Sequence, residues 1–150
     1  MGCELAMACD IRVAADTAQF GLPETNQAII PGAGGAQRLA RLVGIGRAIE
    51  LILTGRLVTG AEAAAMELVS QVVASDELVS DAREVALKIL AQGLFAVRLA
   101  KLAIRTGMDA DQRTGLVVQQ LAQSLVYTSE DKREGVDAFS AKRPAAFDGK

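Results

Sequence analysis

Two glutamates near the amino end of the chain, Glu4 and Glu24, are candidates for acid–base chemistry. Glu4 stands among small and apolar residues in MGCELAMACD, and Glu24 follows Pro23 in the apolar-flanked stretch FGLPET. Two carboxyl groups in poorly solvated places can be driven to different protonation states, so that one site holds both an acid and a base near neutral pH. Because the chain has 18 acidic residues, the spacing alone also fits two unrelated surface side chains.

A glycine-rich stretch, PGAGGAQRL, follows at residues 31–39. It departs from the dinucleotide-binding fingerprint because Gln37 stands where the third glycine is required, and it has no lysine for a phosphate-binding loop. The stretch still predicts a helix start with bare backbone N–H groups, which either approach a ligand or pack closely against a neighbour. Gly2 heads the first expected helix in the same way, where unpaired N–H groups suit an oxyanion that develops during a reaction.

The composition excludes several classes of site. The chain contains no histidine, which rules out a Ser-His-Asp triad, a Cys-His pair and an HExxH zinc site built from this chain alone. Cys3 and Cys9 have neither zinc-ligand nor redox spacing and fit a packed interior, so we expect no metal site. A net charge of −2 and an aromatic content of 3% argue against nucleic acid as a partner. Arg98, Lys101 and Arg105 share one helix face, which fits a solvated surface but could also contact phosphates.

The general class of the protein follows from length and hydropathy. The 150 residues, 51% hydrophobic and 23% charged, suit one soluble globular domain. No stretch approaches the roughly 18 apolar residues of a membrane span, and the amino terminus lacks the order of a signal peptide. We therefore expect a protein of the cytoplasm, or of an organelle matrix if a targeting segment was lost, without a membrane partner.

The elements that would position these residues change in character near residue 60. Residues 1–60 hold most of the glycines and two of the three prolines, which predicts turns and short strands around a site. Residues 61–150 predict successive helices that act as scaffold in the same continuous domain. Thr59 and Glu62 form a capping box ahead of one of these helices. Helices are expected at residues 2–8, 33–43, 45–54, 63–68, 78–89, 95–106, 111–127 and 130–140, with strands in IRVAA and VSQVVA.

Five motifs, taken in order, resemble the enoyl-CoA hydratase (crotonase) family: GCELAMACDIRVAADTAQFGLPET, IIPGAGGAQRLARLVG, ELILTGR, ELVSQVV and EDKREGVDAFSAKRPAAF. The similarity runs from residue 1 to about residue 148, and the correct order makes it far more specific than any one motif. It implies an α/β fold, in which a fragment of the crotonase-like ββα superhelix is followed by a helical carboxy-terminal trimerisation region.

The resemblance also implies a reaction. Hydratases of this family add water across the C2=C3 bond of an enoyl thioester, with no cofactor beyond the coenzyme A that is part of the substrate. By this resemblance Glu4 orients and deprotonates the water, and Glu24 donates the proton to C2. Both glutamates are present, which favours a hydratase over the family isomerases that retain only the second.

Further positions match family sites for the substrate. Two backbone N–H groups of the family hold the thioester oxygen as negative charge builds on it, and Lys142 matches a position that approaches the coenzyme A adenine and 3′-phosphate from a neighbouring subunit. The resemblance therefore predicts oxyanion or pocket backbone at Met1, Gly2 and Gly32, and substrate binding at Leu22, Pro23 and Lys142. It also predicts a homotrimer or hexamer.

The chain departs from the family pattern in three places. Met1 stands where a glycine that supplies one oxyanion N–H is expected, and the first part of the family domain is missing. Glu67 replaces a glycine, and Gln123 stands where some hydratases carry an aromatic residue near the adenine. The expectation is therefore the carboxy-terminal part of a crotonase, weak or inactive by itself. The alternatives are a non-catalytic crotonase-like subunit, another crotonase reaction such as enoyl-CoA isomerisation, and RNA binding, which one family member shows.

Overall fold

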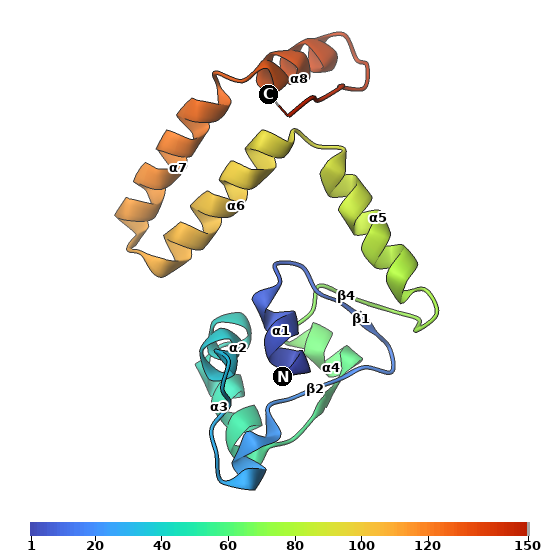
Figure 1. The fold of residues 1–150 in the computed structure, drawn as a ribbon, viewed down its shortest axis with the longest axis vertical. Coiled ribbons are helices and arrows are strands. Elements are labelled where there is room, and N and C mark those ends of the chain that lie inside the picture. Colours follow the sequence, from blue (N-terminus) through green and yellow to red (C-terminus); the bar gives the residue numbers. More distant parts are fainter. Residues whose placement is uncertain (150) are drawn as a thin grey trace. The chain divides into compact units, whose positions relative to one another are not determined.

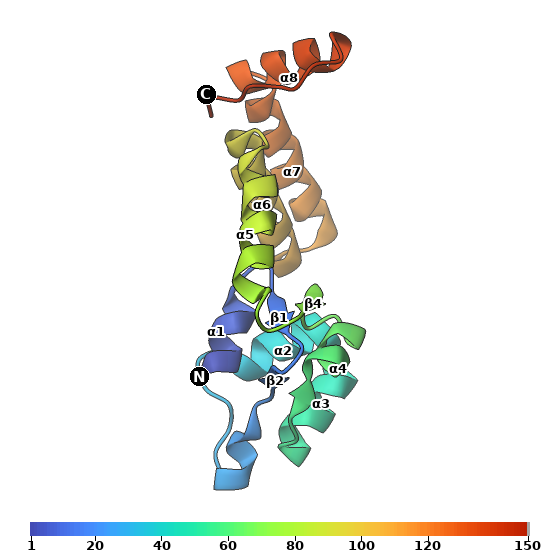
Figure 2. The same cartoon turned by 90° about the vertical axis from the view of Figure 1, so that its right-hand side faces the viewer.

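The computed structural model describes residues 1–149 and divides the chain into two compact units, Met1–Arg83 and Glu84–Lys150. The first unit contains short helices and strands, and the second contains helices (Figures 1 and 2). The compositional boundary after residue 60 lies inside the first unit.

The first unit is built on two small sheets with helices around them (Figure 1). β1 and β4 run parallel, with Val13 opposite Gln71 and Ala15 opposite Val73, and β2 pairs antiparallel with β3, with Phe20 opposite Val58. In chain order the elements are α1 (Gly2–Ala8), β1 (Val13–Ala15), β2 (Gln19–Phe20), the 3₁₀ helix η1 (Pro23–Gln27), α2 (Gly35–Val43), α3 (Ile45–Thr54), β3 (Val58–Thr59), α4 (Gly60–Ala65) and β4 (Gln71–Val73).

Backbone conformation explains where the helices of the first unit begin and end. Ala33 and Gly34 have positive φ angles of 47° and 76°, so α2 begins at Gly35 and not at residue 33 as predicted. Gly55, also left-handed, ends α3 as expected. The predicted capping box of Thr59 is present in both directions and starts α4 at Gly60, three residues before the predicted start.

The core of the first unit holds apolar side chains from all four of its helices. Leu39 and Val43 of α2 and Leu51 of α3 lie on the faces that point inward, which matches the periodicity of the sequence. Besides these three, the cluster contains Met7, Ala14, Leu22, Ala48, Val58, Ala63, Met66, Leu68 and Val69. These side chains hold α1, η1 and α2 in place, and those elements carry the candidate site.

The second unit centres on the hairpin of α6 (Leu94–Asp109) and α7 (Gln112–Val126), which pack side by side (Figure 1). α5 (Leu78–Leu90) begins in the first unit and leads into the second, and α8 (Glu130–Ser140) follows the hairpin. α6 runs three residues beyond its predicted end at residue 106, because Gly107 packs against Gly115 of α7 and does not stop the helix. Among the described residues, no helix has the length and apolar character needed to cross a membrane.

Candidate active site

Glu4 is a buried carboxylate on a short helix. It lies in the first turn of α1, and only 5% of its surface is exposed. The pattern of its neighbours explains this burial, because Met7, one turn further along α1, belongs to the core. A carboxylate at this depth is uncommon unless it is paired or has a function.

Gly35 fixes the position of the Glu4 side chain. A Cβ atom at Gly35 would lie 3.0 Å from Cγ of Glu4 and 3.2 Å and 3.3 Å from the two terminal carbons of Leu22. Leu22 is 1% exposed, so it has no room to move away. The glycine-rich stretch thus contributes close packing at Gly35, one of the two readings that the sequence allowed.

Glu24 lies on η1, and residue types in and around η1 explain where this short helix begins and ends. Pro23 occupies the first helical position, where its fixed φ and missing N–H are tolerated. The Thr25 hydroxyl donates a hydrogen bond of 2.7 Å to the carbonyl of Ile52, which anchors η1 to α3. Ala28 ends η1 with a left-handed φ of 57°. The half-buried Glu24 is therefore held on a short element that a hydrogen bond ties to α3.

The structure brings the two carboxyl groups together. The pKa of Glu4 is lowered, first by a hydrogen bond from the Met1 ammonium, against the opposing effect of burial, and the Glu24 carboxyl lies close enough to contribute to the shift. The Met1 nitrogen lies 2.7 Å from Oε2 of Glu4. Burial is the main cause that raises the pKa of the neighbouring Cys3 thiol, and the charges of both glutamates add to it.

The pair has hydrogen-bonding capacity that the protein does not use. Within residues 1–149, the buried Oε2 of Glu24 has no hydrogen-bond partner, and Oε2 of Glu4 has none apart from the Met1 ammonium. Buried carboxylate oxygens are normally satisfied, so Oε2 of Glu24 is available to a water molecule or a reacting group, while Oε2 of Glu4 is occupied by the Met1 ammonium. Two adjacent carboxyls of this kind can divide acid and base roles between them.

The other residues predicted for this site differ in how deeply they are buried. Leu22 and Pro23 lie directly before Glu24, with Leu22 in the core and Pro23 half-buried. Met1 and Gly2 are exposed at the start of α1. Gly32 is exposed, and its carbonyl accepts the N–H of Gly35 at 2.8 Å, which closes the turn before α2. Among residues 1–149, no three histidine, cysteine, aspartate or glutamate side chains are grouped closely enough to hold a metal ion.

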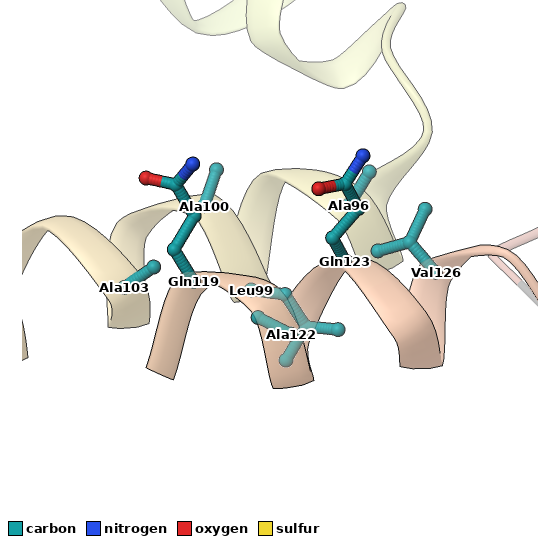
Figure 3. A pocket seen from close by; sticks show the side chains of 8 residues that line it. All are labelled: Ala96, Leu99, Ala100, Ala103, Gln119, Ala122, Gln123 and Val126. Atoms are coloured by element: carbon teal, nitrogen blue, oxygen red, sulfur yellow. The ribbon is translucent and has the colours of Figure 1, made fainter. Parts of the chain in front are cut away.

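Two predicted positions lie in the second unit. Lys142 is exposed just after α8 and has a left-handed φ of 51°. Gln123 lines a groove of about 360 Å³ between α6 and α7, where its amide and that of Gln119 stand on the same side (Figure 3). Leu99 and Ala122 contribute apolar lining between the two helices (Figure 3).

Sequence reasoning missed two residues that shape the site. Gly35 was one of three glycines in a loop, and nothing local distinguishes the one that packs on Glu4. Thr25 anchors η1 through a hydrogen bond to Ile52, a residue 27 positions away. The sequence around Thr25 contains no local signal for this bond, because its acceptor lies far away along the chain.

Comparison with known proteins identifies the relatives of this arrangement. The sequence profile described as enoyl-CoA hydratase/isomerase matches residues 1–150. Crotonyl-CoA hydratase of Syntrophomonas wolfei is 44% identical over 146 residues, which is 97% of this chain and 56% of that protein. The mitochondrial methylglutaconyl-CoA hydratase of Homo sapiens is 45% identical over 152 residues, with 99% of this chain and 45% of that protein covered.

Solved structures agree with the sequence relatives. The crystal structure of enoyl-CoA hydratase from Bacillus anthracis superposes with a TM-score of 0.97 at 49% identity, covering 99% of this chain and 58% of that one. The chain belongs to the enoyl-CoA hydratase/isomerase family, and its crotonase-like fold, predicted from the motifs, is confirmed. The chain spans about half the length of the relatives it matches.

Proposed function

We propose that this chain carries the catalytic glutamate pair of an enoyl-CoA hydratase, which adds water in the syn sense across the C2=C3 bond of an enoyl-CoA thioester. The observation that carries this proposal is the proximity of the buried Glu4 to the half-buried Glu24, whose buried Oε2 has no hydrogen-bond partner among the described residues. Glu4 orients the water and takes its proton, while Glu24 delivers a proton to C2. Named hydratases among the relatives support the reaction class.

The rest of the proposed site binds the thioester. Met1, Gly2 and Gly32 supply oxyanion or pocket backbone, and removal of one such donor typically costs roughly 10²–10³ in rate. Leu22 and Pro23, directly before Glu24, form part of the substrate-binding site, with the Leu22 side chain packed in the core behind it. Lys142 binds the coenzyme A portion of the substrate, and the reaction needs no other cofactor.

We propose further that the 150-residue chain alone is weak or inactive, because it spans only about half the length of the relatives it matches. The Met1 ammonium lies 2.7 Å from Oε2 of Glu4 and takes up hydrogen-bonding capacity of this carboxylate. In a chain that continues upstream, a neutral amide would replace the ammonium. We propose that this chain corresponds to the carboxy-terminal part of the family domain, and that activity needs the upstream part.

We also propose a homotrimer or hexamer located in the cytoplasm or an organelle matrix. Each unit has large apolar side chains on its surface, including Ile30, which is 82% exposed, and Phe139, which is 86% exposed. Such side chains are commonly buried between subunits. Both cysteines are free thiols, which fits a reducing compartment.

The experiment that tests the reaction follows the oxygen atom of water. Crotonyl-CoA and methylglutaconyl-CoA are incubated in H₂¹⁸O with the 150-residue chain and with a version extended upstream. A hydratase places ¹⁸O on C3 of the product, whereas an isomerase moves the double bond and incorporates no ¹⁸O. A product with a shifted double bond and no label would replace the hydratase by the isomerase alternative. If neither version turns over either thioester, the non-catalytic alternative stands.

A further inference from the structure

The segment that follows α8 is held in place by two acidic side chains of that helix. Asp131, in the first turn of α8, is buried and accepts the backbone N–H groups of Asp148 at 2.8 Å and Gly149 at 3.0 Å. Glu134, one turn further, accepts the N–H of Ala146 at 2.8 Å. Residues 144–149 therefore run back beside α8 as a strap (Figures 1 and 2).

An aromatic side chain packs the strap against two glycines. A Cβ atom at Gly135 of α8 would lie 3.5 Å from the ring of Phe147, and one at Gly93, before α6, would lie 3.8 Å from the same ring. These are ordinary contact distances, so Phe147 packs directly against both backbones. The strap thus joins α8 to the start of α6 within the second unit.

The turn that enters the strap contains Lys142 in an unusual conformation. The N–H of Arg143 donates to the carbonyl of Ala138 and the N–H of Lys142 to that of Phe139, which is the hydrogen-bond pattern of a Schellman motif. Its left-handed position is normally occupied by glycine, and here it holds Lys142 with a φ of 51°. A lysine in a conformation that disfavours side chains needs a surrounding structure that enforces it.

Glu134 supplies that enforcement through Arg143. Both guanidinium Nη atoms of Arg143 bond to the Glu134 carboxylate, at 2.6 Å and 2.8 Å. The hydrogen bonds from Arg143 lower the pKa of Glu134 to about 2, so the pair stays ionised at neutral pH. These two parallel hydrogen bonds fix the position of Arg143, which directly follows Lys142. The same carboxylate accepts the N–H of Ala146, on the other side of the turn.

From these contacts we propose that Glu134 is a positioning residue for Lys142, and that it acts through Arg143 and the strap to hold this lysine ready for a phosphate-bearing coenzyme. The proposal rests on the proposed function, because it takes coenzyme A as the ligand of Lys142. Glu134 does not touch the ligand itself. It restricts the conformations of the turn and of Lys142 before the ligand binds. Binding then costs less conformational entropy.

A double-mutant cycle tests the proposal with coenzyme A as the probe and calorimetric affinity as the readout, in the version of the chain extended upstream. Lys142→Met removes the ammonium, and we expect coenzyme A to bind about tenfold more weakly. Glu134→Gln should weaken binding about two- to tenfold, which is the cost of ordering one long side chain. In the Lys142→Met background, Glu134→Gln should cause no further loss. A purely structural role would instead give additive losses.

Controls separate a local effect from general damage. Glu130→Gln makes the same chemical change on an exposed glutamate of α8, and it should leave affinity unchanged. Hydrogen exchange at the Ala146 and Asp148 amides should accelerate in Glu134→Gln and stay slow in Lys142→Met. If the Glu134→Gln variant does not fold, Arg143→Lys replaces it in the test. This substitution keeps the positive charge but removes the paired hydrogen bonds to the Glu134 carboxylate.

The outcomes distinguish this proposal from the one on which it rests. If Lys142→Met weakens binding and Glu134→Gln does not, or if the two losses add, Glu134 has no positioning role while the coenzyme site stands. If the unaltered chain does not bind coenzyme A, or binds it as well as Lys142→Met does, the assignment of Lys142 fails and the positioning role fails with it.

Discussion

Replacement of Gly35 by alanine should disturb the glutamate pair more than any other small change in the first unit. The new Cβ would lie 3.0 Å from Cγ of Glu4 and 3.2–3.3 Å from the terminal carbons of Leu22. Each contact is tighter than normal packing, and both neighbours are buried. Glu4 must therefore shift by a few tenths of an ångström, or α2 must move away from α1.

The expected magnitude comes from two opposing effects. Overpacking a close-fitted interior costs about 1–3 kcal/mol. Alanine in place of glycine in a helix returns up to about 1 kcal/mol, and less at the first position of α2. We expect Gly35→Ala to lower the free energy of unfolding by about 1–2 kcal/mol. Because a displacement of reacting groups by about 1 Å can cost roughly 100-fold in rate, activity should fall more than stability alone would suggest.

Urea unfolding measures the stability effect, and Gly46→Ala is the matched control. Gly46 also lies near the start of a helix, but a Cβ atom there would meet nothing within 4 Å. The control should be as stable as the original chain or slightly more stable. Equal stability of the Gly35→Ala and Gly46→Ala variants would show that Gly35 is not closely packed on Glu4, and would refute this reasoning.

Three further predictions concern the backbone, the amino terminus and the helical hairpin. Glu67 has a φ of 65°, so Glu67→Gly should stabilise the chain by about 1 kcal/mol in urea unfolding. Acetylation of Met1 removes the main cause that lowers the pKa of Glu4, so an NMR titration should show a higher pKa for this carboxyl. A Cβ atom at Gly115 would lie 3.0 Å from the Cα of Gly107, so Gly115→Ala should cost about 1–2 kcal/mol in thermal or urea unfolding.

The pH dependence of the acetylated chain follows from the sign of the Glu4 shift. A carboxyl whose pKa is lower in the folded state stabilises the protein above its unfolded pKa of about 4.3, and this stabilisation is lost as the pH falls through the folded value. The chain with a free ammonium should therefore lose more stability on acidification than the acetylated chain. Identical losses would show that the Met1–Glu4 pair contributes nothing.

The two backbone predictions have controls within the chain. Glu84→Gly, inside α5, should destabilise by about 1 kcal/mol, because glycine is unfavourable in a regular helix. A Cβ atom at Gly107 would lie 3.6 Å from Gly115, an ordinary contact, so Gly107→Ala should be tolerated. Destabilisation by Glu67→Gly, or equal effects of alanine at positions 107 and 115, would contradict the corresponding prediction.

The sequence predicted those parts of the fold that local chemistry determines. Gly55 ended α3, Ser129 capped α8 and Thr59 formed its capping box, since each signal acts within a few residues of itself. The family motifs added the pairing of Glu4 with Glu24, which no periodicity could supply. The proximity of the two carboxyls agrees with that resemblance, although their chemical roles stay predictions.

The features that the sequence did not predict depend on distant partners. β3 was missed because its two residues gain their extended form from pairing with β2, about 40 positions earlier. The helix predicted for residues 95–106 continues to Asp109, and within this extension Gly107 lies against Gly115 of α7. The segment after Pro144 has no regular secondary structure, as its sequence predicts, but its attachment to Asp131 and Glu134 of α8 was not predicted.

The cooperation of Glu4 and Glu24 in water addition is tested most directly by a second mutant cycle. The hydration rate of crotonyl-CoA is measured for Glu4→Gln, Glu24→Gln and the double variant, in the 150-residue chain and in the version extended upstream. Residues that act as a unit are strongly non-additive. We predict that in the extended version each single variant loses roughly 10³-fold or more in kcat and that the double variant loses little beyond this. Full activity of either single variant would contradict the account.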